Sequence, residues 1–291
     1  MLIKESHIDV PTKADGEGNM RKAPANLIPN EGIFLHHPTI PSHPRARFPG
    51  VVLFSEIYQV TGPVARLARQ IAGRGYIVAA LSSYHEFTGP EALSYDNAGT
   101  DAGNKYKKQK TLGGYDEDAK LTVDALIEQK TCNGMIGAAG MCLGGHLALR
   151  CCVTESSRVK AGMCWFATDL QYPSSSSERR GTLGKGGDDT LQRVGECGGE
   201  VIMVHGKLDN HVPPAARDLI RRRMHEEGVN FSWYEIAGAQ HAFIRDELSK
   251  GRYDPPVADI TFEMMMELFG RTLRSHLGER DDGKVKVEDV C

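Results

Sequence analysis

The stretch MIGAAGMCLGGHLAL, from Met135 to Leu149, decides the fold that we expect for this chain. It begins with a short run of small and apolar residues, which is typical of a buried parallel strand, and it continues into a helix-forming sequence. Between the two halves, Cys142 lies between Gly140 and Gly144. The succession of strand, glycine-flanked turn and helix predicts a backbone that changes direction sharply at a single thiol.

On both sides of this stretch, apolar runs alternate with amphipathic segments. Helical spacing of apolar residues is clear in GPVARLARQIAGRG and in PAARDLIRRRMHEEG. Besides the strand within 134–141, we expect buried strands at residues 50–57, 76–84, 161–167, 200–206 and 230–238. Such alternation predicts an α/β fold with a mostly parallel central sheet and helices on both faces, formed by one domain over residues 1–291.

Three segments fall outside the alternation. Residues 1–30 form an N-terminal extension. Its segment SHIDVPT is expected to pair with EGIFLHHP, which directly follows the extension, as two opening strands. Residues 86–114 are polar and contain several glycines, so we interpret them as a long surface excursion that could act as a lid. Residues 278–291 are a charged tail.

Composition narrows the classes of function. The formal net charge is −3, so the chain has no basic surface signature for nucleic acid. No apolar run approaches the roughly 18 residues of a membrane span, and the N-terminus lacks the apolar core of a signal peptide. The seven cysteines include no CxxC pair, which indicates mostly reduced thiols and a cytoplasmic location. We therefore expect a small-molecule substrate, no cofactor, and either a monomer or a homodimer.

Cys142 is the candidate nucleophile. Residues 140–144 have the form G-x-C-x-G, and with serine at its centre this pattern is the nucleophile elbow of α/β-hydrolases. In that turn, strain and small neighbours expose the central side chain, and the start of the following helix favours a thiolate. For the other cysteines inside the chain, Cys132, Cys151, Cys152, Cys164 and Cys197, we expect the role of small buried apolar residues.

A cysteine nucleophile needs a base, and the base needs an orienting acid. Asp209 follows the expected strand at 200–206, and His241 follows the strand at 230–238. Both would lie at the carboxyl edge of the sheet, in the nucleophile–acid–histidine order of α/β-hydrolases. His205 and His211 flank the acid, but HxH and HExxH spacings are absent from the sequence, so we predict no metal site.

Together these residues resemble the dienelactone hydrolase family. GMCLGG matches the family's G-x-C-x-G-G elbow, and VVLFSEI matches a strand that ends in a glutamate, here Glu56. Asp209 and His241 match the acid and the histidine of the family's catalytic residues. Phe243 and Arg245 match an aromatic residue and an arginine that follow the histidine, and the resemblance covers residues 50–277.

The resemblance implies an α/β-hydrolase fold and a mechanism. In the family, the glutamate contacts the resting thiol until substrate displaces it, and then takes the thiol proton. Carried over, Glu56 would activate Cys142 to attack a lactone or ester carbonyl. The backbone N–H groups of Leu143 and Ile57 would form the oxyanion hole. The histidine, oriented by the acid, would then activate the water that cleaves the acyl-enzyme.

One stretch departs from the family pattern. Members that act on dienelactone hold its carboxylate with two arginines, of which one matches Arg245. Where the second arginine is expected, this chain has SSYHEF. Tyr84 fits an aromatic position of the family pattern, and Glu86 falls near the place of the arginine. His85 could substitute for the arginine only when it is protonated. An acidic side chain there would repel a carboxylate. We therefore expect weak activity on dienelactone and better activity on a neutral or larger lactone or ester.

The sequence leaves other functions open. One alternative is a thioesterase or carboxylesterase with an unrelated substrate, and another is a noncatalytic binding protein with the same fold. A redox-sensing thiol is a further alternative, which would need a resolving cysteine such as Cys164 close to the elbow.

Overall fold

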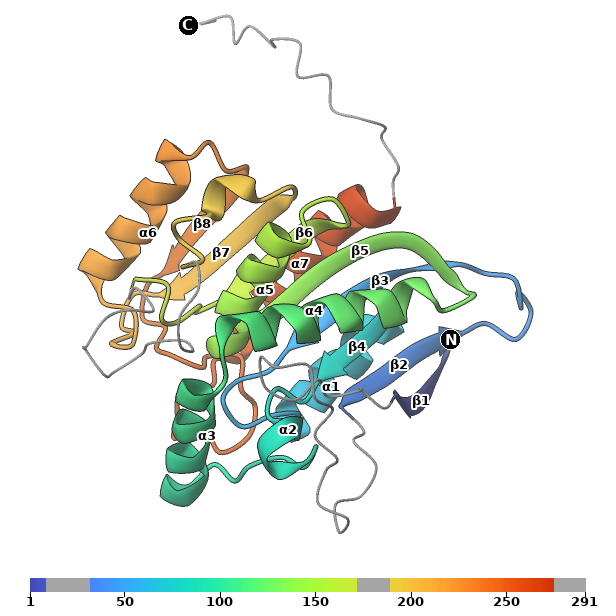
Figure 1. The fold of residues 1–291 in the computed structure, drawn as a ribbon, viewed down its shortest axis with the longest axis horizontal. Coiled ribbons are helices and arrows are strands. Elements are labelled where there is room, and N and C mark those ends of the chain that lie inside the picture. The colour runs from blue at the N-terminus through green and yellow to red at the C-terminus, as the bar shows by residue number, and fades with distance from the viewer. Residues whose placement is uncertain (9–31, 172–188, 275–291) are drawn as a thin grey trace, which may run out of the picture.

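The computed structural model describes residues 1–8, 32–171 and 189–274. Within these residues the chain forms one sheet of eight strands in the order β1-β2-β4-β3-β5-β6-β7-β8 (Figure 1). The strands are β1 (Leu2–Ile8), β2 (Ile33–Thr39), β3 (Phe48–Phe54), β4 (Ile77–Leu81), β5 (Cys132–Met141), β6 (Val159–Trp165), β7 (Glu200–Gly206) and β8 (Phe231–Ile236). From β4 to β8 all neighbours run parallel, which confirms the predicted sheet.

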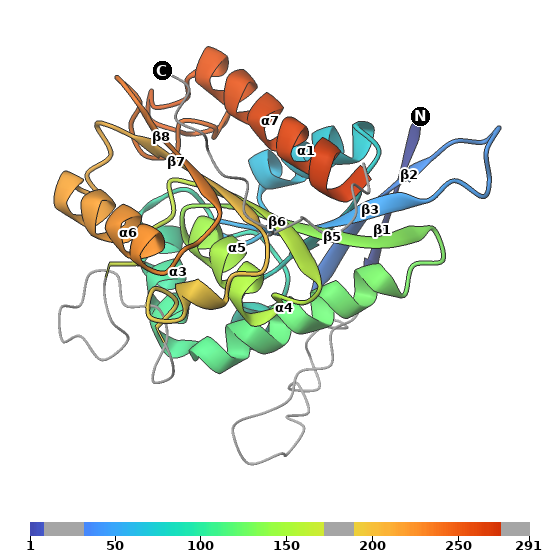
Figure 2. The same cartoon turned by 90° about the horizontal axis from the view of Figure 1, so that it is seen from above.

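Helices cover both faces of this sheet, as the alternating sequence pattern predicts. In Figure 2, α1 (Gly62–Gly73) and α7 (Pro255–Phe269) lie on one side, where their apolar residues join one core cluster. On the other side lie α4 (Leu112–Ile127), α5 (Leu143–Thr154) and α6 (Pro214–Glu226), which pack into a second cluster. Because β3 and β4 are buried on both faces, they consist of continuous apolar runs.

An opening pair of strands is present, but its first strand starts earlier than predicted, because β1 begins at Leu2 whereas SHIDVPT begins at Ser6. β1 and β2 pair antiparallel with Leu2 opposite Thr39, and β2 continues the sheet antiparallel to β4. Of the remaining predicted segments, most of the N-terminal extension and the charged tail lie outside the described residues. No helix in the described ranges is long and apolar enough to cross a membrane.

The segment 86–114 is more ordered than its composition indicates. It contains most of α2 (His85–Thr88), all of α3 (Asn97–Gln109) and the first turn of α4. The Asp96 side chain caps α3 by accepting from the Gly99 N–H at 2.7 Å. Thr111 caps α4 in the same way through the Gly114 N–H, so α4 begins four residues before the predicted acidic start at 116. The long surface excursion expected from the glycines is therefore a segment of capped helices.

Two short helical turns complete the described chain. The 3₁₀ turn η1 (Val194–Glu196) precedes β7, and the π-helical turn η2 (Gly270–Arg274) extends α7. The topology places the ends of β3, β5, β7 and β8 at one edge of the sheet, where the candidate residues follow them.

Candidate active site

The elbow at Cys142 has the strained backbone that the motif predicts. Its φ of 59° and ψ of −120° lie in a region that residues other than glycine rarely adopt. Four backbone hydrogen bonds hold this conformation. The Cys142 N–H donates to the Trp165 carbonyl at 3.0 Å. The Cys142 carbonyl accepts from the N–H groups of Gly145 at 3.1 Å, Thr168 at 3.2 Å and His146 at 3.4 Å. The thiol is thereby fixed between β5 and α5.

Glycines around the elbow are required by close backbone packing. A Cβ atom on Gly140 would lie 2.1 Å from the Gly144 carbonyl oxygen, and one on Gly144 would lie 2.2 Å from the Phe54 carbonyl oxygen. A Cβ on Gly145 would also lie 2.6 Å from the Trp165 carbonyl oxygen. The first turn of α5 therefore crosses directly over β3 and β6.

The acid and the histidine meet at the edge of the sheet where the elbow lies. The His241 Nδ1 and Asp209 Oδ2 atoms are 2.8 Å apart, and Asp209 Oδ1 accepts from the His211 N–H at 2.8 Å. His241 and Asp209 are 6% and 2% exposed. The Cys142 thiol lies close enough to the imidazole to influence the pKa of His241. The structure thus brings together the three residues that the sequence singled out.

The charges of this group depend on one another. Burial opposes protonation of the imidazole, but a Cys142 thiolate and the Asp209 carboxylate outweigh it and raise the pKa of His241 to about 10. Burial likewise opposes ionisation of Asp209, whereas its hydrogen bond with His241 lowers the pKa of the carboxyl below its ordinary value. These opposite shifts favour an imidazolium at His241 paired with a carboxylate at Asp209.

Aromatic rings position the imidazole. Phe166, at a φ of 37°, packs edge-on against His241 at 4.9 Å between ring centroids and against Phe243 at 5.0 Å. The His211 ring lies 4.3 Å from that of His241, and burial lowers the pKa of His211 to about 4. Phe243, which the resemblance placed among substrate contacts, is fully buried behind Phe166. Phe166 and His211 were not predicted, because neither belongs to a local motif.

Glu56 is buried near the start of the loop after β3, and its carboxylate has polar partners. The Tyr95 hydroxyl donates to Glu56 Oε2 at 3.1 Å, and Arg245 Nη1 lies 3.4 Å from Oε1. The Arg245 guanidinium lies over the Tyr95 ring at 4.3 Å and donates to the Leu248 carbonyl at 3.3 Å. Both oxygens of Glu56 therefore have partners other than the thiol, and Arg245 already has a counter-ion.

Tyr84 and His85 of the departing stretch are both buried and have partners on neighbouring helices. Tyr84 is fully buried, with its ring 5.6 Å from Tyr106 of α3, and burial raises the pKa of its hydroxyl. His85 is 3% exposed, and its Nε2 lies 3.3 Å from Asp118. Its partner is thus a carboxylate of α4.

Glu86 is compensated by a cation that the sequence did not reveal. The Lys110 Nζ lies 2.7 Å from Glu86 Oε1 and also donates to Asp118 and to the Ser83 carbonyl. The Lys110 side chain is 1% exposed, whereas the Glu86 side chain is 29% exposed, so Glu86 pairs with a buried cation from the surface. The expectation of an unbalanced acidic charge at Glu86 needs this correction, because Lys110 neutralises it.

Another buried ion pair lies beside the elbow. Lys107 of α3 donates to Asp169 Oδ2 at 2.9 Å, and the two side chains are 8% and 7% exposed. Asp169, at a φ of 68°, directly follows Thr168, whose N–H binds the Cys142 carbonyl. Lys107 lies in the run KYKKQK, where nothing in the sequence distinguishes it from the neighbouring lysines. Its buried contact was therefore not predictable.

The two candidate oxyanion donors are N–H groups at the start of α5 and in the loop after β3. Leu143 is the first residue of α5, where an N–H group has no intrahelical acceptor. Ile57 follows Glu56, and a Cβ on Gly103 of α3 would lie 2.4 Å from the Ile57 carbonyl oxygen, so α3 packs closely on this loop. Neither N–H has a hydrogen-bond acceptor among the residues that the structure describes.

The remaining histidine and cysteine candidates lie in packing positions. His205 is fully buried with its ring 4.8 Å from that of Trp233, and burial lowers its pKa to about 4. No group of three or more His, Cys, Asp or Glu in the described ranges could hold a metal ion. Burial raises the pKa of the Cys164 thiol, which makes it a poor partner for thiol–disulfide exchange.

These features define the class of the protein. A nucleophile elbow followed along the chain by an acid and a histidine, all at the carboxyl edge of a mostly parallel sheet, is the arrangement of an α/β-hydrolase. The sequence model of the dienelactone hydrolase family matches residues 37–273. The chain therefore belongs to the dienelactone hydrolase family and is a hydrolase.

Known proteins support this assignment. The chain is 47% identical over 264 residues to a Saccharomyces cerevisiae protein named "Putative carboxymethylenebutenolidase", a match that covers 89% of this chain and 93% of the relative. The dienelactone hydrolase-like promiscuous phosphotriesterase P91 from metagenomic libraries superposes with a TM-score of 0.66 at 17% identity, covering 93% and 98% of the two chains. The apo form of Thermogutta terrifontis esterase 2 gives 0.59 at 20% identity, covering 91% and 93%. These two structures share the fold.

Replacing Gly144 with alanine should destabilise the protein, because the new Cβ would lie 2.2 Å from the Phe54 carbonyl oxygen. We expect the free energy of unfolding, measured by urea denaturation, to fall by about 2–3 kcal/mol. Gly113→Ala is the matched control, since a Cβ there meets nothing within 4 Å and alanine favours a helix. Equal stability of the two variants would contradict the close approach of α5 to β3.

The charge on His241 can be measured by nitrogen chemical shifts of its ring. In the wild type the ring should remain protonated up to a pKa of about 10, and in Cys142→Ala this pKa should fall because the thiolate is gone. Since the folded pKa is raised, the imidazolium stabilises the fold fully below its unfolded pKa of about 6.5. That contribution declines as pH rises through about 10. An imidazole that titrates near 6.5 in both proteins would exclude the ion pair.

Proposed function

We propose that this protein hydrolyses a lactone or small ester through an acyl-enzyme on Cys142. The observation that carries the proposal is the arrangement of the thiol: a strained elbow presents it to the imidazole of His241, which Asp209 holds at 2.8 Å. A nucleophile, a base in contact with it and an orienting acid are the parts that acyl transfer requires.

The chemistry follows from these positions. The Cys142 thiolate attacks the carbonyl carbon, and the negative oxygen that forms is received by the N–H groups of Leu143 and Ile57. When the C–O bond breaks, the imidazolium of His241 gives its proton to the leaving alkoxide. The neutral ring then takes a proton from water, which attacks the thioester and releases the carboxylic acid and the thiolate. In a lactone, the alkoxide stays attached to the acyl chain.

The proton of the resting thiol has two candidate acceptors. The family resemblance assigns it to Glu56, whereas the contact between Cys142 and the imidazole supports His241. Because Glu56 is held by Tyr95 and Arg245, it needs to leave these partners before it can reach the thiol. We therefore assign the first proton transfer to His241 and give Glu56 the role of a charged group in the wall of the site.

We further propose that the substrate is neutral where it meets the site. Each buried cation near the thiol already has a carboxylate: Arg245 has Glu56, and Lys107 has Asp169. A substrate carboxylate would have to displace one of these partners, and breaking a buried ion pair is costly. Poor turnover of free acids is therefore expected because the cations are already paired, and not because Glu86 repels a carboxylate.

The α3 helix supplies a wall of the same site. It contributes Lys107, and it packs on the loop that carries Ile57 through Gly103. The Tyr58 and Thr100 hydroxyls also form a hydrogen bond of 2.9 Å between that loop and α3. We propose that residues 86–114 act as the cover of the active site, within a single-domain enzyme that works in the cytoplasm as a monomer or homodimer without a cofactor.

Removal of the nucleophile tests the proposal most simply. Cys142→Ala should lower kcat for p-nitrophenyl esters and for a simple lactone by at least about 10⁴-fold, because the covalent route is lost. Cys197→Ala is the control, since Cys197 is a half-buried thiol outside the site. The two variants should have the same circular dichroism spectrum. If the protein is a noncatalytic binding protein, the wild type will turn over none of these substrates. If Cys142→Ala keeps its activity, the thiol mechanism is excluded.

Substrate charge can be tested with dienelactone and its methyl ester. The wild type should prefer the methyl ester in kcat/KM by about tenfold or more, which corresponds to about 1.4 kcal/mol. Asp169→Asn should raise kcat/KM for the free acid by about tenfold, because it releases Lys107 while asparagine tolerates a positive φ. Asp101→Asn, on the exposed side of α3, should change neither value. A wild type that prefers the free acid tenfold would refute the neutral-substrate proposal and leave the triad untouched.

A further inference from the structure

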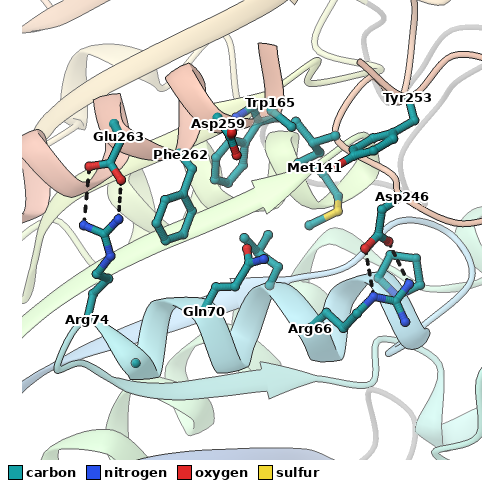
Figure 3. Close-up of a pocket in the computed structure, with 15 residues that line it drawn as sticks. Arg66, Gln70, Arg74, Met141, Trp165, Asp246, Tyr253, Asp259, Phe262 and Glu263 are labelled. Atoms are coloured by element: carbon teal, nitrogen blue, oxygen red, sulfur yellow. Dashed lines mark hydrogen bonds and ion pairs between the residues drawn. The ribbon is translucent and has the colours of Figure 1, made fainter. Parts of the chain in front are cut away.

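A cavity of about 680 Å³ lies between α1 and α7, and two arginines in its lining are already paired (Figure 3). Arg66 lies 2.7 Å from Asp246, and Arg74 pairs with Glu263, as the dashed lines in Figure 3 mark. Neither of these arginines is therefore left to bind an anionic ligand. The core on the opposite face of the sheet has a different feature, which is a pair of thiols that the proposed hydrolysis does not use.

The two thiols belong to Cys152 and Cys197, and the backbone holds them near each other. Cys152 lies close to the end of α5, and Cys197 follows η1 in the segment that leads into β7. The Gly198 N–H donates to the Cys152 carbonyl at 3.3 Å, so a single hydrogen bond joins the two backbones. Both side chains pack into the core cluster on the α5 face of the sheet.

Both sulfur atoms lie over the place where the start of β6 meets the chain entering β7. A Cβ atom on Gly162 of β6 would lie 2.7 Å from Cys152 Sγ. The Cys197 Sγ atom lies 3.6 Å from the carbonyl oxygen of Gly199, the residue before β7. A Cβ on Gly199 would in turn lie 2.6 Å from the carbonyl carbon of Lys160 in β6. The two side chains therefore converge on the same part of β6.

The two thiols differ in accessibility and in acidity. Cys152 is fully buried, whereas Cys197 is half-buried and can be reached from solvent. Interaction with Cys197 and burial together raise the pKa of Cys152 well above its ordinary value. Interaction with Cys152 lowers the pKa of Cys197. An accessible thiolate beside a neutral thiol is the combination that peroxide oxidation of a dithiol requires.

We propose that Cys152 and Cys197 form a redox site that a hydroperoxide converts into a disulfide. The Cys197 thiolate attacks the peroxide O–O bond and becomes a sulfenic acid, and the leaving oxygen takes up the proton that Cys197 released. The Cys152 sulfur then attacks the sulfenic sulfur. An S–S bond replaces the S–O bond, and the hydroxyl leaves as water with the Cys152 proton. Two thiols thus lose two electrons, and the hydroperoxide is reduced.

The redox site is separate from the nucleophile. Cys142 lies directly before α5, whereas Cys152 lies three turns further along the same helix. No step of the proposed hydrolysis enters the argument for the disulfide, and the oxidant is a hydroperoxide and not an ester. A chain that hydrolyses nothing would therefore still form this disulfide, and an active hydrolase that does not form it would contradict only this proposal.

Peptide mass spectrometry without reducing agent tests the proposal directly. The fully reduced wild type would be treated with hydrogen peroxide, its free thiols would be blocked with iodoacetamide, and the protein would be digested with trypsin. We expect the peptide 151–158 to be joined to the peptide 194–207 with the loss of two hydrogen atoms. Fragmentation should place the bond on Cys152 and Cys197, and dithiothreitol should remove it.

Cys151 provides a matched control, because it lies in the same peptide as Cys152 and burial raises its pKa as well. Cys151→Ala should keep the cross-link, whereas Cys152→Ala and Cys197→Ala should each lose it. In Cys152→Ala, the sulfenic acid should persist on Cys197 and react with dimedone.

The proposal is overturned if the peroxide-treated wild type contains no bond between Cys152 and Cys197. It is also overturned if either cysteine is joined to a different cysteine in place of its proposed partner, or if Cys197→Ala keeps the same cross-linked peptide. Because the wild-type measurement identifies the bonded residues by itself, it decides the question even if a variant does not fold.

Discussion

The hydrogen bond from the Cys142 N–H to the Trp165 carbonyl is the interaction on which the site depends. It holds a residue other than glycine at a φ of 59°, a conformation that costs on the order of 1–3 kcal/mol and persists only where its surroundings enforce it. Glycines at 140, 144 and 145 let α5 pass within van der Waals distance of β3 and β6. The direction of the thiol and the free N–H at the start of α5 both follow from this packing.

Buried charges around the elbow are arranged in balanced groups. His241 and Asp209 form one such group, and Glu56–Arg245 and Lys107–Asp169 place further opposite charges in contact. Each pair neutralises groups that would be costly to bury alone. The proposed preference for a neutral carbonyl compound over a free acid follows from this pairing, because the cations beside the elbow already have carboxylate partners.

The central features of the site were predictable from sequence because they are local. The G-x-C-x-G turn needs glycines at fixed offsets, and the acid and histidine follow strands that apolar runs mark clearly. The parallel sheet, the helices on both faces and the opening strand pair were likewise predicted from hydrophobic periodicity. Each of these signals lies within about ten residues of the feature that it specifies.

Features that depend on long-range contacts were not predictable. The α3 helix is rich in glycine and charge, so its sequence has no apolar period, and its contacts with the Ile57 loop are made through Gly103 and Thr100. Lys107 reaches a partner 62 residues away, and Arg245 reaches one 189 residues away. The ion pair between Glu86 and Lys110 was not predictable for the same reason. No pattern in a single sequence encodes which charges meet after folding.

The account rests on a covalent intermediate at Cys142, and trapping that intermediate tests it most directly. Wild-type protein and His241→Ala would be quenched with acid during turnover of p-nitrophenyl acetate, digested, and analysed by peptide mass spectrometry. The account predicts an acetyl group on the peptide that carries Cys142, at higher occupancy in His241→Ala because that variant lacks the base for deacylation. Continued turnover by the wild type with acetyl on another residue, or with no adduct in either protein, would contradict the assignment of Cys142 as the nucleophile.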